Sequence, residues 1–121
     1  MALKMRVLYA MNITSTGNTT ICPSTFVAAK TYLVKRVAVI NRGSNPATIS
    51  LNVNIQGSGT AYLVSPYNVV LQPNGQLIID DEITLAPFDS SPTANYDKLV
   101  LNISGTTPNL DCVVTGLDRD L

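Results

Sequence analysis

The segment from Tyr32 to Ile55 constrains the fold more than any other part of this chain. Apolar and polar residues alternate strictly from Thr48 to Ile55, which is the period of a β-strand with one buried face and one solvated face. The residues before Asn41 are rich in valine and isoleucine, which favour strands. Between these halves, Asn41–Pro46 is a cluster of turn-forming residues, and its proline cannot donate a ladder hydrogen bond. The sequence therefore predicts a central β-hairpin whose second strand begins after Pro46.

Further short strands are indicated on both sides of this segment, with turn residues between them. Pro73-Asn74-Gly75 is the strongest of the tight-turn signals. The predicted strands are Lys4–Thr14, Thr19–Cys22, Ala61–Val64, Tyr67–Leu71, Gln76–Asp80, Ile83–Leu85, Lys98–Ser104 and Leu110–Leu117. This spacing predicts an all-β fold, a single antiparallel β-sandwich or jelly roll of about eight short strands.

The domain organisation follows from length and from the aperiodic stretches. With 121 residues there is room for one domain over 1–121. Residues 1–6 are expected to form an N-terminal arm and residues 117–121 a polar C-terminal tail. Ala86–Asn95, which has two prolines and many small polar residues, is expected to be a surface loop.

Composition argues against several classes of partner. Charged residues make up only 13% of the chain, and the formal net charge is zero. No electrostatic field is indicated that would attract nucleic acid or an anionic membrane, so neither is expected as a partner. A weakly charged surface tolerates close packing against other copies or proteins. No run of eighteen apolar residues or signal-peptide pattern is present, so synthesis in a cytoplasm is expected.

The side chains offer little catalytic chemistry. The chain has no histidine, which removes the commonest general base and the commonest metal ligand. Cys22 and Cys112 are too few to complete a tetrahedral zinc site, and two buried free thiols are the expectation, with a Cys22–Cys112 disulfide left open. We therefore expect a protein that is not an enzyme and that has no cofactor and no metal.

Three weaker interpretations remain. Asp80-Asp81-Glu82 could form one side of a calcium site, although a solvated strand end is favoured. Glu82 with Asp89 has the residue types of a glycosidase pair. The tyrosines could stack sugars, although closing the ends of a sandwich is the commoner role. These tyrosines are Tyr9, Tyr32, Tyr62, Tyr67 and Tyr96.

Two neighbouring basic residues, Lys35 and Arg36, interrupt the valine-rich strand. Strict alternation predicts that they lie on opposite faces, so that a continuous nucleic-acid patch is not formed. Arg36 would then lie in line with the apolar side and need a carboxylate partner, for which Asp80 or Asp111 is expected.

Several segments together carry a resemblance to a known group of proteins. Val34–Arg42 followed by Ala47–Leu51, the turn Leu71–Leu77 and the late strand Asp97–Ser104 resemble small β-sandwich virion structural proteins of tailed bacteriophages. The resemblance implies a non-enzymatic virion protein, most closely a capsid decoration or cement protein that binds and stabilises the shell. It implies the major capsid protein or another virion protein as partner, a homo-oligomer (a trimer by analogy), and a location in the virion. The alternative is a tail or neck adaptor, or a carbohydrate- or receptor-binding module of a tail structure.

Contacts with a partner are expected from loops and termini, because strands are committed to the core. The candidate interface residues lie in the arm, the central turn, the long loop and the tail. They are Met1, Lys4, Arg6, Arg42, Asn45, Phe88, Asp89, Tyr96, Arg119 and Leu121.

Overall fold

The chain folds into strands alone over the part that the structure describes. This computed structural model describes residues 5–22, 30–55, 61–85 and 97–120. Those residues contain no helix that is long and apolar enough to span a bilayer. The strands are β1 (Arg6–Ile13), β2 (Gly17–Cys22), β3 (Lys30–Asn41), β4 (Ala47–Asn54), β5 (Ala61–Leu63), β6 (Val69–Leu71), β7 (Gln76–Ile79), β8 (Ile83–Leu85), β9 (Lys98–Gly105) and β10 (Leu110–Asp120).

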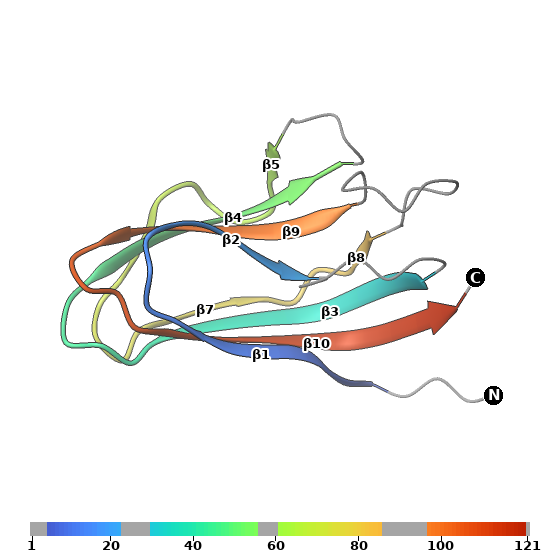
Figure 1. The fold of residues 1–121 in the computed structure, drawn as a ribbon, viewed down its shortest axis with the longest axis horizontal. Helices are drawn as coiled ribbons and strands as arrows, with labels where there is room; N and C mark the ends of the chain where they lie inside the picture. Colours follow the sequence, from blue (N-terminus) through green and yellow to red (C-terminus); the bar gives the residue numbers. More distant parts are fainter. Residues whose placement is uncertain (1–4, 23–29, 56–60, 86–96, 121) are drawn as a thin grey trace.

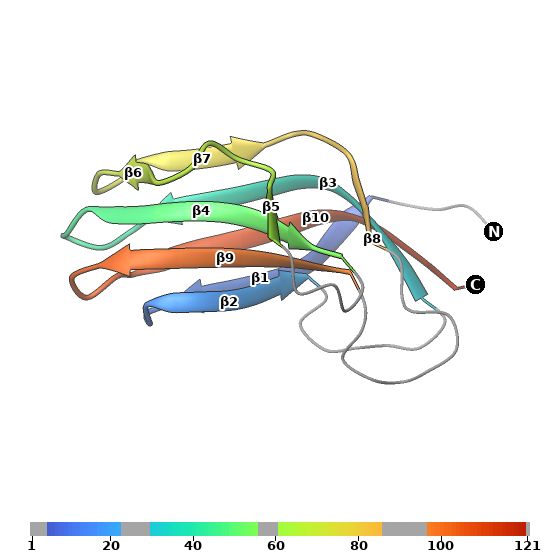
Figure 2. The same cartoon turned by 90° about the horizontal axis from the view of Figure 1, so that it is seen from above.

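The strands form two antiparallel sheets that pack face to face (Figures 1 and 2). Sheet A has the order β1-β10-β3-β7, and β8 also pairs with β3. Sheet B has the order β2-β9-β4-β5, and β6 also pairs with β4. Because β7 and β8 share one edge of β3, and β5 and β6 share one edge of β4, each sheet has four strand positions. This is a jelly-roll arrangement, and it confirms the predicted antiparallel sandwich, with ten strands where about eight were expected.

The predicted central hairpin is wrong. β3 belongs to sheet A and β4 to sheet B, and the two strands do not pair with each other. The turn Arg42–Pro46 instead carries the chain from one sheet to the other. The connections 14–16, 72–75 and 106–109 also cross between the sheets, and these four connections lie at the same end of the sandwich (Figure 1). Alternation shows that a strand has one buried face, but it does not show which strand lies beside it.

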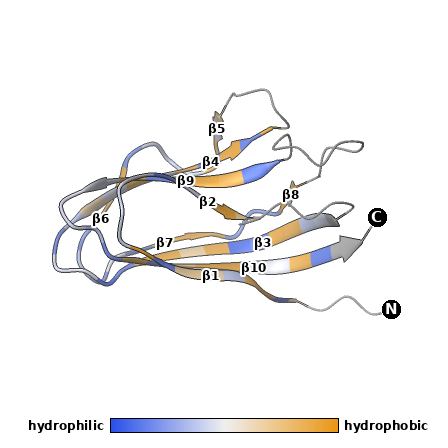
Figure 3. Cartoon of the chain, in the orientation of Figure 1, coloured by the Kyte–Doolittle hydropathy of each residue, from blue (hydrophilic) through white to orange (hydrophobic). Residues whose placement is uncertain are grey.

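The core lies between the sheets and is built from alternate residues of the long strands. Val37 and Val39 on β3, and Ile49 and Leu51 on β4, are almost completely buried. The residues predicted to face inward on β9 are buried as well, which confirms the alternation argument; they are Leu99, Leu101 and Ile103. Figure 3 shows apolar and polar stretches following one another along β3 and β10.

The predicted ends of the chain need correction. β1 begins at Arg6, so this residue belongs to a strand and not to an arm. The expected polar tail is also wrong for residues 117–120, because β10 continues to Asp120. Its last residues pair with the first residues of β3, from Lys30 to Leu33. The length of β3 explains the difference, since it offers a pairing edge beyond the point where the apolar pattern ends.

Candidate functional site

The end of the sandwich where these four connections cross between the sheets is held by one buried amide side chain, Asn41. Its side chain is 0% exposed. Asn41 Nδ2 donates hydrogen bonds to the carbonyl oxygens of Asn45 and Leu71, both at 2.9 Å, and Asn41 Oδ1 accepts one from the Gly43 N–H at 2.9 Å. The backbone of Asn41 bonds to Gly75 and Asn74. One residue thus joins the β3–β4 and β6–β7 connections.

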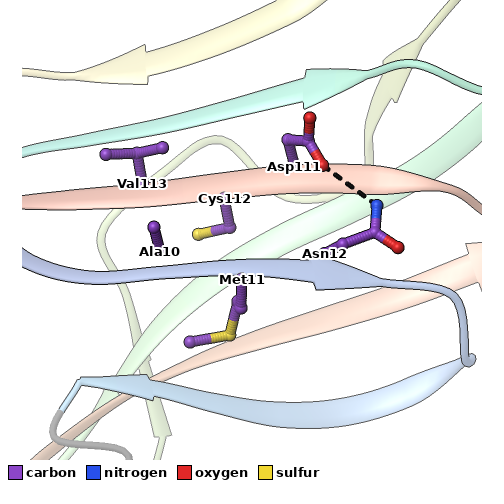
Figure 4. Close-up of a pocket in the computed structure, with 6 residues that line it drawn as sticks. All are labelled: Ala10, Met11, Asn12, Asp111, Cys112 and Val113. Atoms are coloured by element: carbon purple, nitrogen blue, oxygen red, sulfur yellow. Dashed lines mark hydrogen bonds between the residues drawn. The ribbon is translucent and has the colours of Figure 1, made fainter.

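The predicted interface residues of the central turn lie in a second polar network, at the surface of this end. Arg42 Nη1 lies 3.1 Å from Asp111 Oδ2. Asn12 Nδ2 donates to Asp111 Oδ1 at 2.9 Å (Figure 4) and to Asn109 Oδ1 at 2.7 Å. Asn45 Nδ2 donates to Thr107 Oγ1 at 2.8 Å. Arg42 and Asn45 therefore brace the crossing turns from within the chain, a role that the sequence did not predict.

A shallow hollow lies where β1 and β10 pair beside this network. Its volume is about 320 Å³, and its lining residues are Ala10, Met11, Asn12, Asp111, Cys112 and Val113 (Figure 4). Its polar side chains, Asn12 and Asp111, already bond to each other. Within the described ranges, no group of three or more His, Cys, Asp or Glu side chains could hold a metal ion.

The acidic cluster at the end of β7 faces basic residues of β3. Arg36 Nε lies 3.2 Å from Asp80 Oδ1, and Lys35 forms an ion pair with Glu82. The expected Arg36–Asp80 partnership is thus present, but Arg36 is exposed, so its expected inward position is wrong. A register shift explains this: Thr115 pairs with Arg36 but Gly116 pairs with Val34, which leaves Lys35 as the extra residue of a β-bulge. The alternation that would have placed Lys35 and Arg36 on opposite faces is broken at that point.

The other candidates have separate outcomes. Arg6 forms an ion pair with Asp118 near the end of β10. Arg119 lies in β10, but its side chain is outside the described part of the structure. The remaining candidates lie outside the described residues, so the expected long loop and the Glu82–Asp89 pair are not addressed; they are Met1, Lys4, Phe88, Asp89, Tyr96 and Leu121.

The tyrosines divide into an inner and an outer group. Tyr32 is buried, and its ring centroid lies 6.4 Å from that of Tyr9. Burial, followed by the neighbouring Tyr9 hydroxyl, raises the pKa of Tyr32 above its ordinary value. Tyr62 and Tyr67 are exposed instead of closing the sandwich.

Four exposed apolar side chains are spread along β5, β6 and the turn between them, on both faces of this edge of sheet B, and we call these residues the tyrosine edge. Its residues are Tyr62, Leu63, Tyr67 and Val70. Sequence reasoning proposed tyrosines as sugar-stacking residues but did not predict that exposed apolar side chains would lie along this edge. One signal for it was present in the sequence, because no charged residue occurs from Gly43 to Ile79.

The two cysteines confirm the expectation of buried free thiols. Cys22 on β2 and Cys112 on β10 come from different sheets, and both are free and buried. Burial raises the pKa of both thiols to about 12, and for Cys22 the nearby Cys112 adds to this effect. Neither group is therefore a thiolate nucleophile at neutral pH.

This burial predicts how the thiols react. In the folded protein at pH 8, we expect iodoacetamide to label neither Cys22 nor Cys112, because only about one thiol in ten thousand would be ionised. Mass spectrometry in urea should show two labels. Rapid labelling of either cysteine in the native state would contradict the burial of the thiols.

The same raised pKa values predict how the stability of the fold depends on pH. Because the folded-state pKa of both thiols is raised, their contribution to the free energy of unfolding should be full below pH 9 and fall as the pH rises toward 12.

Comparison with known proteins supports the fold and does not identify a family. No protein-family model and no curated protein matches the chain. Among solved structures, the Drosophila NLP core, described in terms of pentamer formation and histone binding, aligns over 98% of this chain and 100% of its own, with a TM-score of 0.51 and 10% identity. A xylan-binding domain of carbohydrate-binding module family 22 aligns over 84% of this chain and 65% of its own (TM-score 0.38, 20% identity).

A viral protein also appears among these structures. The infectious bursal disease virus Gx strain structure aligns over 97% of this chain and 32% of its own, with a TM-score of 0.40 and 10% identity. At these identities, the likeness to the NLP core indicates a shared sandwich fold and nothing about activity. The alignments with TM-scores below 0.5 support no conclusion about this chain.

Proposed function

We propose that this chain is a non-enzymatic structural protein of a bacteriophage virion, most closely a capsid decoration protein that binds and stabilises the shell. The observation that carries the proposal is the uneven distribution of charge between the two sheets. Lys98 is the one charged residue within the five strands of sheet B, whereas sheet A contains several ion pairs. Depletion of charge is typical of surfaces that become buried against another protein.

The outer surface of sheet B supplies polar groups suited to such a contact. Asn18, Asn102 and Ser104 are exposed there, and Asn102 Nδ2 donates to Asn18 Oδ1 at 2.8 Å. Amide and hydroxyl groups both donate and accept hydrogen bonds, so they pair with main-chain groups of a partner without leaving a charge buried. The sequence resemblance to phage virion proteins makes the major capsid protein the proposed partner, with assembly as a homo-oligomer in the virion.

The first test is the protein composition of purified phage particles. Mass spectrometry should find this chain in a copy number comparable to that of the main shell protein. A few copies per particle would move the protein to the neck or tail, and absence from particles would overturn the proposal. If the outer surface of sheet B makes the contact, Asn102→Lys should weaken binding to shells at least about tenfold. Thr84→Lys, at an exposed position on sheet A, is the control and should bind normally.

A second candidate is a carbohydrate- or receptor-binding module of a tail structure. The exposed rings of Tyr62 and Tyr67 favour it, since an aromatic ring beside polar side chains offers a stacking surface. Binding on a glycan array that is lost in Tyr67→Ala would support this reading, and a silent array would count against it.

A further inference from the structure

The tyrosine edge is an unpaired edge of sheet B that exposes apolar surface. Tyr62, Leu63, Tyr67 and Val70 are 56%, 49%, 71% and 54% exposed. β5 and β6 both pair with β4 on one side, and within the described residues no strand pairs with their other side (Figure 2). Among the described residues, the main-chain groups on that side have no strand partner, which is the arrangement that accepts a further strand.

This edge lacks the charges with which proteins usually protect a free edge. From Gly43 to Ile79 the chain has no Asp, Glu, Lys or Arg, although charged side chains are a common protection of edge strands against pairing. Pro66, between β5 and β6, and the shortness of both strands limit uncontrolled strand addition. By contrast, the β1 edge of sheet A carries the Arg6–Asp118 ion pair. The tyrosine edge thus has the composition of an interface centre, rich in tyrosine and free of charge.

We propose that the tyrosine edge binds the tyrosine edge of a second copy of this chain, about a two-fold axis. A partner that placed a charge against this edge would bury it without a counter-ion, which costs several kcal/mol. The same edge of a second copy brings no charge into the contact, because it is uncharged and apolar. A two-fold axis also sets the two edge strands antiparallel, as in the rest of the sheet.

The size of the edge is adequate for a specific contact. A standard interface buries about 800 Å² on each partner, about an eighth of the 6624 Å² accessible surface of this chain. At exposures of 56% and 71%, Tyr62 and Tyr67 present roughly 250 Å² between them. The two tyrosines alone thus supply about a third of the area that a standard interface buries on each partner, before Leu63, Val70 and the strand backbone are counted.

This contact is separate from the proposed attachment to a shell. It is centred on the edge of sheet B, where Val70 follows Ser104 and Thr48 in one cross-strand row, and it leaves Asn18 and Asn102 on β2 and β9 for the shell. Used alone, the contact gives a dimer, and combined with a three-fold contact it joins two trimers.

Two valines with the same exposure provide a matched experiment. Val70 on the tyrosine edge and Val7 on the β1 edge are each 54% exposed. Light scattering coupled to size exclusion should show the full chain as a dimer or a multiple of two. Val70→Lys should raise the dissociation constant at least about 100-fold, because the two-fold axis brings two lysines into one uncharged interface. Val7→Lys should leave it unchanged.

Two kinds of result would overturn the proposed two-fold contact. A wild-type chain that stays monomeric, or that forms trimers alone, overturns the two-fold contact without touching the proposal of a shell protein. Dissociation caused by Val7→Lys and not by Val70→Lys overturns it as well. If Val70→Lys does not fold, as judged by its circular dichroism, Tyr67→Ser in the exposed turn replaces it with the same expected dissociation.

Discussion

Replacing Asn41 with alanine is expected to lower the free energy of unfolding by about 3–5 kcal/mol. The substitution removes a buried side chain that bonds to Gly43, Asn45 and Leu71. The carbonyl of Leu71 loses a buried hydrogen bond, and each polar group left unpaired in the interior costs about 1–3 kcal/mol. Urea denaturation followed by circular dichroism measures the loss.

Asn45→Ala is the matched control at the same end of the sandwich. The bond from Asn45 Nδ2 to Thr107 Oγ1 is at the surface, so its loss should cost less than about 1 kcal/mol. Equal losses for Asn41→Ala and Asn45→Ala would show that Asn41 does not hold the crossing turns.

The variant Asn41→Asp tests the burial of this side chain directly, because it keeps the shape of asparagine and adds a negative charge. The carboxylate keeps the acceptor for the Gly43 N–H but places negative charge against the carbonyl oxygens of Asn45 and Leu71. Its folded-state pKa should rise, so the stability of this variant should fall as the pH increases from about 4 toward 7. A variant whose stability does not change across that range would contradict the burial of this side chain.

The core could be predicted from the sequence because it depends on local alternation. Ile49 and Leu51 lie two residues apart on a strand with one dry face, and the same argument holds for Leu99 and Leu101. The partner of each strand could not be predicted in this way. The turn Arg42–Pro46 has the composition of a hairpin turn, yet it crosses between the sheets, because the buried faces of β3 and β4 face each other through the core.

The candidate site shows the same division between local and long-range information. The pairing of Arg36 with Asp80 could be foreseen from charge, but its exposed position could not, because the β-bulge at Lys35 depends on the register between β3 and β10. The contact of Arg42 with Asp111 depends on the pairing of β3 with β10, which sets Asp111 opposite Ile40. The tyrosine edge was visible as an uncharged stretch, but its position at a free edge required the strand order.

Gly116→Ala is expected to destabilise the fold by about 3–5 kcal/mol, although it adds only one methyl group. A Cβ atom at Gly116 would lie 2.1 Å from the Leu33 carbonyl oxygen and 3.0 Å from Val34 Cα. Both are backbone atoms of the paired strand β3, so no side-chain rotation relieves the overlap, and β10 must separate from β3 beside the bulge. Thermal and urea unfolding measure the loss.

Gly17→Ala provides the control for this effect, because nothing lies within 4 Å of a Cβ at Gly17. Its positive φ of 96° still imposes backbone strain, so a loss of about 1–2 kcal/mol is expected there. If Gly116→Ala costs no more than Gly17→Ala, close approach of the two strands does not explain the glycine. Because Cys112 lies on the same strand as Gly116, faster alkylation of Cys112 in Gly116→Ala, with Cys22 still protected, would locate the opening between β10 and β3.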